Sequence, residues 1–177
     1  MMVLDLPEET AVTLRPLAFV AALLASPALA EDLAQPTGPV LLTIDGAIAH
    51  TNADGQAQFD RAMLEALPVS EFATTTIWTD GTPVFTGVPL NALLDSIGAD
   101  GTLLRAVALN DYGVEIPVAD AVDDGPIVAY EQDGAPMTVR NKGPLWIVYP
   151  YDTNPEYQTE VIYARSIWQL HRIEVLP

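Results

Sequence analysis

Prolines and glycines divide this chain into short apolar runs, and this division most constrains what the chain can fold into. There are 15 prolines and 11 glycines among 177 residues, of which 50% are apolar. Proline removes a backbone donor and glycine weakens regular structure, so brief strands and turns are favoured over long helices. A chain of this length buries one sizeable core. The sequence therefore predicts one α+β domain, a mixed β-sheet with a few short helices.

Apolar and β-branched runs between the breaks predict the strands. They are expected at residues 40–44, 47–49, 72–78, 103–109, 114–118, 127–130, 137–139, 145–149 and 167–175. Asp45-Gly46 and Asp133-Gly134 are typical hairpin turns. Two short helices are expected, one capped by Asp60 and one starting at Pro89, with a polar loop at residues 151–157.

The N-terminal segment has the pattern of an export signal. Residues 17–25 form an apolar stretch too short to span a bilayer, and Ala28-Leu29-Ala30 matches a signal peptidase site. We therefore expect a signal peptide at residues 1–30 with cleavage after Ala30, a flexible lead-in at 31–39 and the domain at 40–177. A buried or membrane-anchoring helix is the alternative for the apolar stretch.

Export predicts a periplasmic or secreted protein with no membrane span after signal cleavage. Acidic residues at positions 5, 8 and 9 are unusual for the start of a signal and indicate that translation begins further along, near Val12.

The charge balance narrows the classes of partner. The chain has 24 acidic residues against 7 Lys and Arg, a formal net charge of −17, which repels nucleic acid phosphates. It has no cysteine, so disulfides, thiolate metal sites and a cysteine nucleophile are excluded. His50 and His171 lack metal-ligand spacing and are expected to be structural or exposed. The sequence predicts neither a metal site nor a catalytic residue.

Three groups of residues remain as candidates for binding. Asn110, Asp111 and Tyr112 lie in a connection between two expected strands, where binding residues are common, although a simple turn is the alternative. Arg140 and Lys142 are two of the basic residues of the mature chain, and the following Gly143 permits close backbone approach. They predict a site for a small anionic ligand, with a surface turn paired to carboxylates as the alternative.

The third group is aromatic. Most of its members are expected in the core, and Tyr149 and Tyr151 are expected to line a pocket; the group is Trp78, Phe85, Trp146, Tyr149, Tyr151, Tyr157, Tyr163 and Trp168.

The order of several motifs is informative: Phe85-Thr86-Gly87-Val88-Pro89-Leu90, then Asn110-Asp111-Tyr112, then Ile127 to Tyr130 with Asp133-Gly134, then Lys142-Gly143-Pro144-Leu145. Together they resemble the oxidoreductase molybdopterin-binding domain of the sulfite oxidase type, especially short exported bacterial proteins that carry this domain alone. The resemblance covers roughly residues 41–175. It implies a mixed α+β fold, a molybdopterin cofactor and an oxidoreductase.

This chain departs from the family pattern at two places. Catalytic members bind molybdenum through a cysteine before the F-x-G-x-P-L motif, and this chain has none. The glycine-proline-leucine motif is commonly followed by arginine, whereas here Trp146 follows it.

Two main functions stay open. The first is an exported small-molecule-binding or accessory domain, without redox catalysis of its own, that takes a small ligand or a periplasmic partner protein near the candidate residues. The alternative is a true molybdopterin-dependent oxidoreductase with a non-cysteine metal ligand, which binds the pterin through Arg140, Lys142 and backbone amides. A third hypothesis, a partner-binding domain without a small-molecule pocket, predicts an exposed apolar patch.

Overall fold

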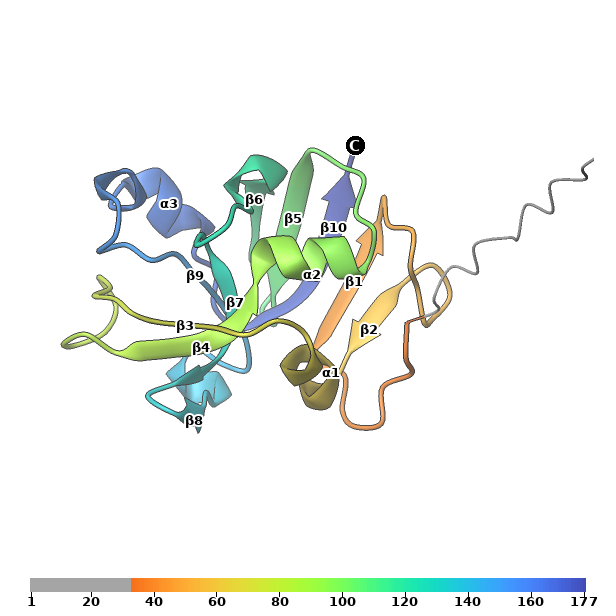
Figure 1. Ribbon diagram of the computed structural model, residues 1–177, viewed down its shortest axis with the longest axis horizontal. Coiled ribbons are helices and arrows are strands. Elements are labelled where there is room, and N and C mark those ends of the chain that lie inside the picture. The colour runs from red at the N-terminus through yellow and green to blue at the C-terminus, as the bar shows by residue number, and fades with distance from the viewer. Residues whose placement is uncertain (1–32) are drawn as a thin grey trace, which may run out of the picture.

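The computed structural model describes residues 33–177, so the expected signal peptide at residues 1–30 lies outside the described part of the chain. Within it, ten strands form two five-stranded sheets (Figure 1). No helix between residues 33 and 177 has the length and apolar character needed to cross a membrane. The α+β class with a mixed sheet and short helices is confirmed.

The first sheet has the strand order β2-β1-β10-β5-β6. Its strands are β1 (Leu42–Gly46), β2 (Ala57–Phe59), β5 (Leu103–Ala108), β6 (Gly113–Pro117) and β10 (Leu170–Leu176). β1 pairs parallel with β10, and the other pairings are antiparallel. The expected hairpin between β5 and β6 is therefore present. The C-terminal strand β10 lies at the centre of the sheet, between β1 and β5.

The expected return strand at residues 47–49 is wrong. Gly46 has a φ of 92°, and a Cβ atom there would overlap the Val175 carbonyl of β10. With β10 on one side of β1, the antiparallel partner on the other side comes from residues 57–59 instead. Ala49 turns away and donates its backbone N–H to the Ile97 carbonyl, 2.9 Å away.

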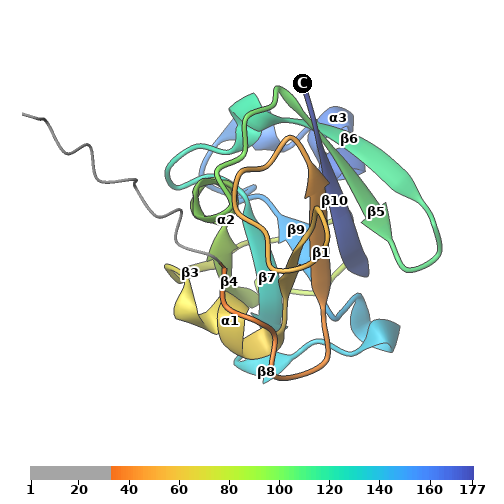
Figure 2. The same cartoon turned by 90° about the vertical axis from the view of Figure 1, so that its right-hand side faces the viewer.

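The second sheet has the order β3-β4-β7-β8, with β9 also paired to β7. Its strands are β3 (Ser70–Ala73), β4 (Val84–Pro89), β7 (Ile127–Gln132), β8 (Ala135–Pro136) and β9 (Trp146–Val148). Figure 2 shows β3, β4 and β7 on one side of the molecule and β1, β10 and β5 on the other. Backbone hydrogen bonds from Ile147 to Ile167 and from Leu170 to Leu145 link β9 to the residues around the start of β10.

Two strand predictions need correction in this sheet. The strand expected at residues 72–78 ends at Ala73, because Thr75 hydrogen-bonds to Asp152 rather than continuing the ladder. The strand expected at 137–139 is replaced by β8 at 135–136, and Val139–Asn141 forms the 3₁₀ helix η2. Local hydrogen bonds form this turn, because the Thr138 carbonyl accepts from the backbone N–H groups of both Asn141 and Gly143.

Three α-helices flank the sheets. Both expected helices are present, α1 (Arg61–Ala66) and α2 (Leu90–Ser96), and the Asp60 carboxylate caps α1 by accepting from the Met63 N–H. The third, α3 (Glu160–Arg165), was not predicted; its cap is the Thr159 hydroxyl, which accepts from the Ile162 N–H. Two further 3₁₀ turns are η1 (Val118–Asp120) and η3 (Pro155–Tyr157), the latter inside the expected loop at 151–157.

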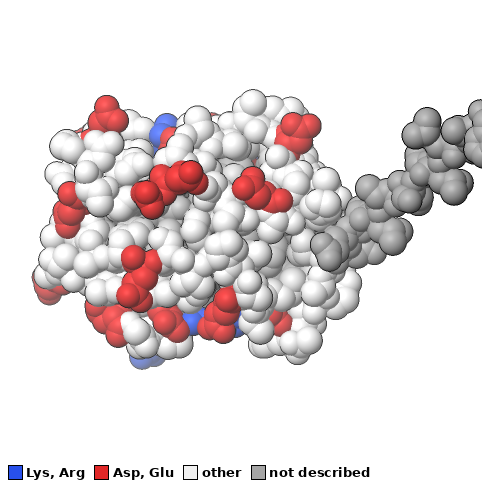
Figure 3. All heavy atoms as spheres, in the orientation of Figure 1, with Lys and Arg blue, Asp and Glu red and all other residues white. Residues whose placement is uncertain are grey.

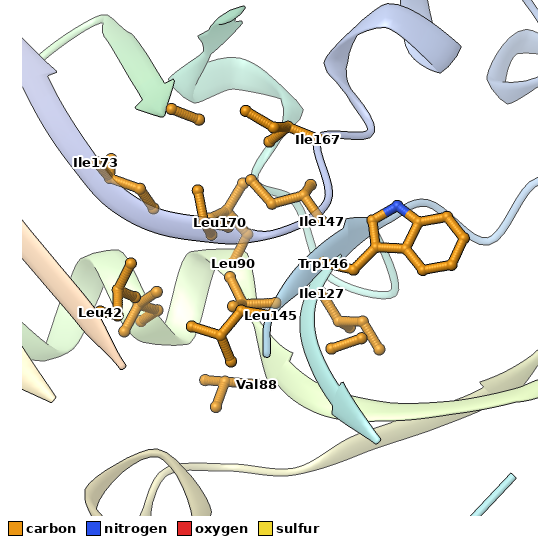
Figure 4. Packing of buried hydrophobic residues seen from close by; sticks show 14 of the residues in the cluster. Leu42, Val88, Leu90, Ile127, Leu145, Trp146, Ile147, Ile167, Leu170 and Ile173 are labelled. Atoms are coloured by element: carbon orange, nitrogen blue, oxygen red, sulfur yellow. The ribbon is translucent and has the colours of Figure 1, made fainter. Parts of the chain in front are cut away.

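The core lies between the sheets and under α2. Figure 4 shows aliphatic side chains from both sheets and α2 in contact, with Trp146 of β9 projecting to one side of them. Trp146, Tyr149 and Tyr151 are the largest side chains with almost no exposed surface. Aromatic contacts link Trp78 to Trp146 and Tyr151, and Tyr151 to Tyr149, and this aromatic cluster carries the candidate site.

Candidate functional site

A pocket of about 290 Å³ opens at the end of the molecule formed by α3, the β5–β6 turn and the β3–β4 connection. Helix α3 and the connection between β3 and β4 lie at the left of Figure 1. Four aromatic side chains dominate its lining, so we call it the aromatic pocket. Its lining residues are Trp78, Ala108, Asn110, Tyr112, Tyr163, Ala164, Ser166, Ile167 and Trp168.

Trp78 is the centre of the aromatic lining. Its ring lies 5.5 Å from that of Trp168 at an angle of 74°, and 5.6 Å from that of Tyr163 at 85°. These are edge-to-face arrangements, which are favourable for aromatic pairs. Behind them, the buried Trp146 contacts both Trp78 and Trp168. The pocket thus has nearly perpendicular aromatic walls resting on the core.

The segment that carries Trp78 is held by hydroxyl groups. Asp152 accepts hydrogen bonds from the Thr75 backbone N–H and hydroxyl, both at 2.6 Å. These bonds keep the pKa of Asp152 below its ordinary value. Thr76 contacts Thr79 through its hydroxyl and accepts from the Trp78 N–H. Trp78 therefore points into the pocket from a fixed loop.

The helix α3 is held in place by buried and partly buried polar contacts. The Tyr151 hydroxyl donates to Ser166, whose hydroxyl donates to the Ile162 carbonyl. The Tyr149 hydroxyl donates to Asp120 at 2.7 Å, and Asp120 also pairs with Arg165 at 2.9 Å. Burial raises the pKa of Tyr149 and that of Tyr151 well above their ordinary values, so both stay protonated donors.

This arrangement corrects one prediction. Tyr149 and Tyr151 were expected to line a pocket, but they are buried at 0% and 1% exposure, and neither belongs to the pocket lining. Their hydroxyl groups find partners inside the protein, so the rings can be buried completely without an unsatisfied donor.

Of the predicted group Asn110, Asp111 and Tyr112, two residues line the aromatic pocket. Asn110 and Tyr112 lie at its rim, on the β5–β6 turn. The Asn110 side chain also accepts from the Tyr112 N–H, as in an ordinary turn. Asp111 has a φ of 64°, is exposed and is absent from the lining. Its backbone conformation is that of a turn residue.

The two predicted basic residues, Arg140 and Lys142, line a different hollow. It measures about 360 Å³, is mainly polar and is lined by Thr79, Asp80, Gln132, Ala135, Pro136, Met137, Arg140, Asn141 and Lys142; we call it the basic hollow. Neither Arg140 nor Lys142 takes part in an ion pair with any of residues 33–177. Instead, the Lys142 Nζ atom lies 5.6 Å from the centre of the Trp146 ring. The carboxylate pairing that was the alternative for this loop is therefore absent from the described part of the chain.

Gly143 is packed against the protein rather than open to a ligand. A Cβ atom there would overlap the Met137 carbonyl group, so no side chain fits. Gly143 thus permits a close approach, but to the backbone of its own loop.

The two hollows are neighbours joined through one residue. Gln169 donates its backbone N–H to the Lys142 carbonyl, and its own carbonyl accepts from the Leu109 N–H, each at 2.9 Å. Trp78 lines one hollow, while Thr79 and Asp80 line the other. Of the predicted site residues, Asn110 and Tyr112 line the aromatic pocket and Arg140 and Lys142 line the basic hollow, whereas Asp111 and Gly143 line neither.

The residues present do not fit a molybdenum centre of the kind that the resemblance implies. The segment before the F-x-G-x-P-L motif offers Thr74, Thr75 and Thr76, and the structure uses their hydroxyls in hydrogen bonds within the protein. Among residues 33–177, no group of three or more His, Asp or Glu side chains could hold a metal ion. Hydroxyl groups engaged in this way do not replace a thiolate as a soft metal ligand.

Sequence reasoning placed Trp78, Tyr163 and Trp168 in the general aromatic group and did not identify them as pocket residues. Tyr163 was missed because α3 was missed. The signal for this helix was Thr159 followed by Glu160 and ending at Arg165, a capping residue with charges suited to the two helix ends. Trp168 is 37% exposed, which only the three-dimensional arrangement reveals.

Comparison with known proteins adds the family. No curated protein matches the sequence. The family described as oxidoreductase molybdopterin binding domain matches residues 51–175, which include β2 to β9, all three α-helices and most of β10. Both hollows lie within the matched range. Because the match covers well over half of the chain, this protein belongs to the oxidoreductase molybdopterin-binding domain family.

Proposed function

We propose that this protein is an exported binding or accessory domain that takes a small molecule in the aromatic pocket and performs no redox catalysis of its own. The observation that carries the proposal is the pocket of about 290 Å³, walled by Trp78, Tyr163 and Trp168 on a rigid core. Apolar pockets with a few polar groups at the rim are typical ligand sites. Here Asn110 is the polar group at the rim.

The second support is chemical. Catalytic relatives place a cysteine before the F-x-G-x-P-L motif, whereas this chain has no cysteine and uses the threonines there to hold the pocket loop. The machinery for the family's redox step depends on that ligand. A domain that keeps the fold but lacks the ligand retains the ability to bind.

The rival is a true molybdopterin-dependent oxidoreductase with a non-cysteine metal ligand, and the family membership favours it. In that case Arg140 and Lys142, which form no ion pair within residues 33–177, hold the cofactor phosphate. The cofactor would then have to reach from the basic hollow to a metal held by other residues. Partner binding without any small molecule is a weaker alternative, because the site is concave.

The experiment that separates these functions uses the full chain expressed in a host that makes molybdenum cofactor and secretes proteins. Purified protein is analysed for molybdenum by plasma mass spectrometry and for pterin by oxidation and fluorescence. The binding domain is expected to contain neither at a stoichiometric level. Near-stoichiometric molybdenum and pterin, lost when Arg140 and Lys142 are both replaced by Ala, would establish the oxidoreductase instead.

Ligand binding is tested on the same sample by fluorescence-detected thermal unfolding against a library of small molecules. A ligand of the aromatic pocket is expected to raise the melting temperature of the native protein and not that of Trp168→Ala. The matched control is Trp78→Phe, which keeps an aromatic wall. Absence of any saturable ligand from a broad library would contradict the binding function.

Export is tested by N-terminal sequencing of the protein recovered from the periplasm or medium. The expected first residue is Glu31. A sequence that retains residues 17–25 would favour the membrane-anchoring alternative for this stretch.

A further inference from the structure

We propose that the ligand of the aromatic pocket is a small organic cation, of the quaternary ammonium or alkylammonium class. The inference rests on the proposed binding function and adds the charge of the ligand. It reverses the anionic ligand expected from the basic loop, because that loop lines the other hollow.

The lining of the aromatic pocket suits a cation better than an anion. It contains no Lys or Arg, and the Ser166 hydroxyl is already used, accepting from Tyr151 and donating to Ile162. An anionic group would thus lack charged donors, which provide most of its binding energy. The aromatic faces carry negative charge density, which attracts cations.

The geometry supports the same ligand. Trp78 stands nearly perpendicular to Trp168 and Tyr163, at 74° and 85°, and Tyr112 completes the lining from the β5–β6 turn. Rings arranged at steep angles surround a compact charge, whereas a flat heterocycle is better held between parallel rings. A volume of about 290 Å³ is sufficient for a small alkylammonium ion.

The charge of the protein points the same way. Over the whole chain the formal net charge is −17, and Figure 3 shows acidic side chains spread across the visible face with few basic ones. A field of this sign raises the local concentration of cations and lowers that of anions.

The test compares two probes of the same shape. Choline carries a quaternary ammonium group, and 3,3-dimethylbutan-1-ol is its neutral analogue. Binding of each to the full chain is measured by titration calorimetry and tryptophan fluorescence at low and high salt. Choline is expected to bind about tenfold or more tightly than the alcohol. Trp168→Ala should weaken choline binding about tenfold, and Trp168→Phe should restore part of it.

Arg140→Ala serves as the matched control, because Arg140 lines the basic hollow and not the aromatic pocket. It should leave choline binding unchanged, and circular dichroism should show that each variant is folded. Equal affinity of choline and the alcohol, or choline binding that survives Trp168→Ala, would overturn the cation assignment while leaving small-molecule binding intact. Failure of choline and tetramethylammonium to bind the native protein would also overturn it, and the library screen then decides separately on the binding function.

Discussion

The aromatic pocket and the basic hollow share the connection between β3 and β4, but different parts of the fold hold them. The aromatic pocket rests on the buried Trp146 and on α3, which is fixed by the buried Tyr149, Tyr151 and Ser166 and the partly buried Asp120. The basic hollow is formed largely by the residues 135–142, where side chains are mostly exposed and backbone contacts set the shape. Rigid aromatic walls suit selection of a ligand, whereas long flexible basic side chains lose entropy when they bind.

The sequence pointed to both members of this pair, to the aromatic pocket through Asn110 and Tyr112 and to the basic hollow through Arg140 and Lys142. Arg140 and Lys142 are conspicuous in an acidic chain, but exposed charges contribute little without a built site around them. Trp78, Tyr163 and Trp168 are scattered along the chain and are brought together only by tertiary contacts. The following substitutions test whether the two hollows contribute differently to stability and to ligand binding.

The largest effect is expected for Trp146→Ala. Trp146 is fully buried, contacts Phe85, Trp78 and Trp168, and lies under both hollows. The free energy of unfolding should fall by about 3–5 kcal/mol, because the change leaves a large cavity. Chemical denaturation measures this. Trp168→Ala is the control: its side chain is partly exposed, so a loss as large as that of Trp146→Ala would argue that both hollows depend on the rim rather than on the core.

Gly143→Ala should damage the basic hollow and spare the aromatic pocket. The added methyl group overlaps the Met137 carbonyl, so the loop must shift at a cost of about 1–3 kcal/mol. Denaturation gives the stability, and choline binding reports on the aromatic pocket. Gly113→Ala is the control, because there the nearest atom to a new Cβ is 3.8 Å away. A loss of choline affinity in Gly143→Ala would mean that the two hollows are coupled, although their linings share no residue.

Asp120→Ala should affect the aromatic pocket rather than the basic hollow, because it weakens the contacts that hold α3. It removes the acceptor of the buried Tyr149 hydroxyl and the partner of Arg165. An unsatisfied buried hydroxyl costs about 1–3 kcal/mol. Adding Tyr149→Phe removes that hydroxyl, so the double variant should recover part of the stability lost. Additive losses in this double-mutant cycle would show that the Tyr149–Asp120 contact contributes nothing.

The smallest expected effect is the loss of stability at low pH that comes from Asp152. Hydrogen bonds from Thr75 hold the pKa of Asp152 below its ordinary value of 3.8, so the carboxylate is favoured in the folded protein. Its stabilising contribution is present above that value and is lost as the pH falls through the lower pKa of the folded state. The difference in stability between the native protein and Asp152→Asn should therefore shrink on acidification. NMR of the Thr75 amide measures the titration; a difference independent of pH would exclude this role.

Much of the fold could be predicted because local signals agreed with the tertiary structure. Asp60 caps α1, and the turn at residues 109–112 joins β5 to β6 as expected. The predictions that failed depended on partners distant in sequence. Residues 47–49 do not pair with β1, because β10 and β2 lie on its two sides. The strand expected at 72–78 ends early, because Thr75 hydrogen-bonds to Asp152.

The candidate site was predictable only in part. Asn110 and Tyr112 were identified because turn residues between strands often bind ligands, and both line the aromatic pocket. Tyr149 and Tyr151 were assigned wrongly because a sequence does not show which buried hydroxyl will find an acceptor, here Asp120 and Ser166.

The sequence by itself determined the α+β class, the family, the absence of a thiolate ligand and the acidic field, because these follow from composition, local periodicity and motif order. The tertiary structure alone decided that four of the predicted site residues line two separate hollows and that Trp78, Tyr163 and Trp168 form the walls of one of them. The reason is physical: ring contacts and burial depend on which distant segments pack together, and pairing such as that of β1 with β10 is not encoded in any local pattern.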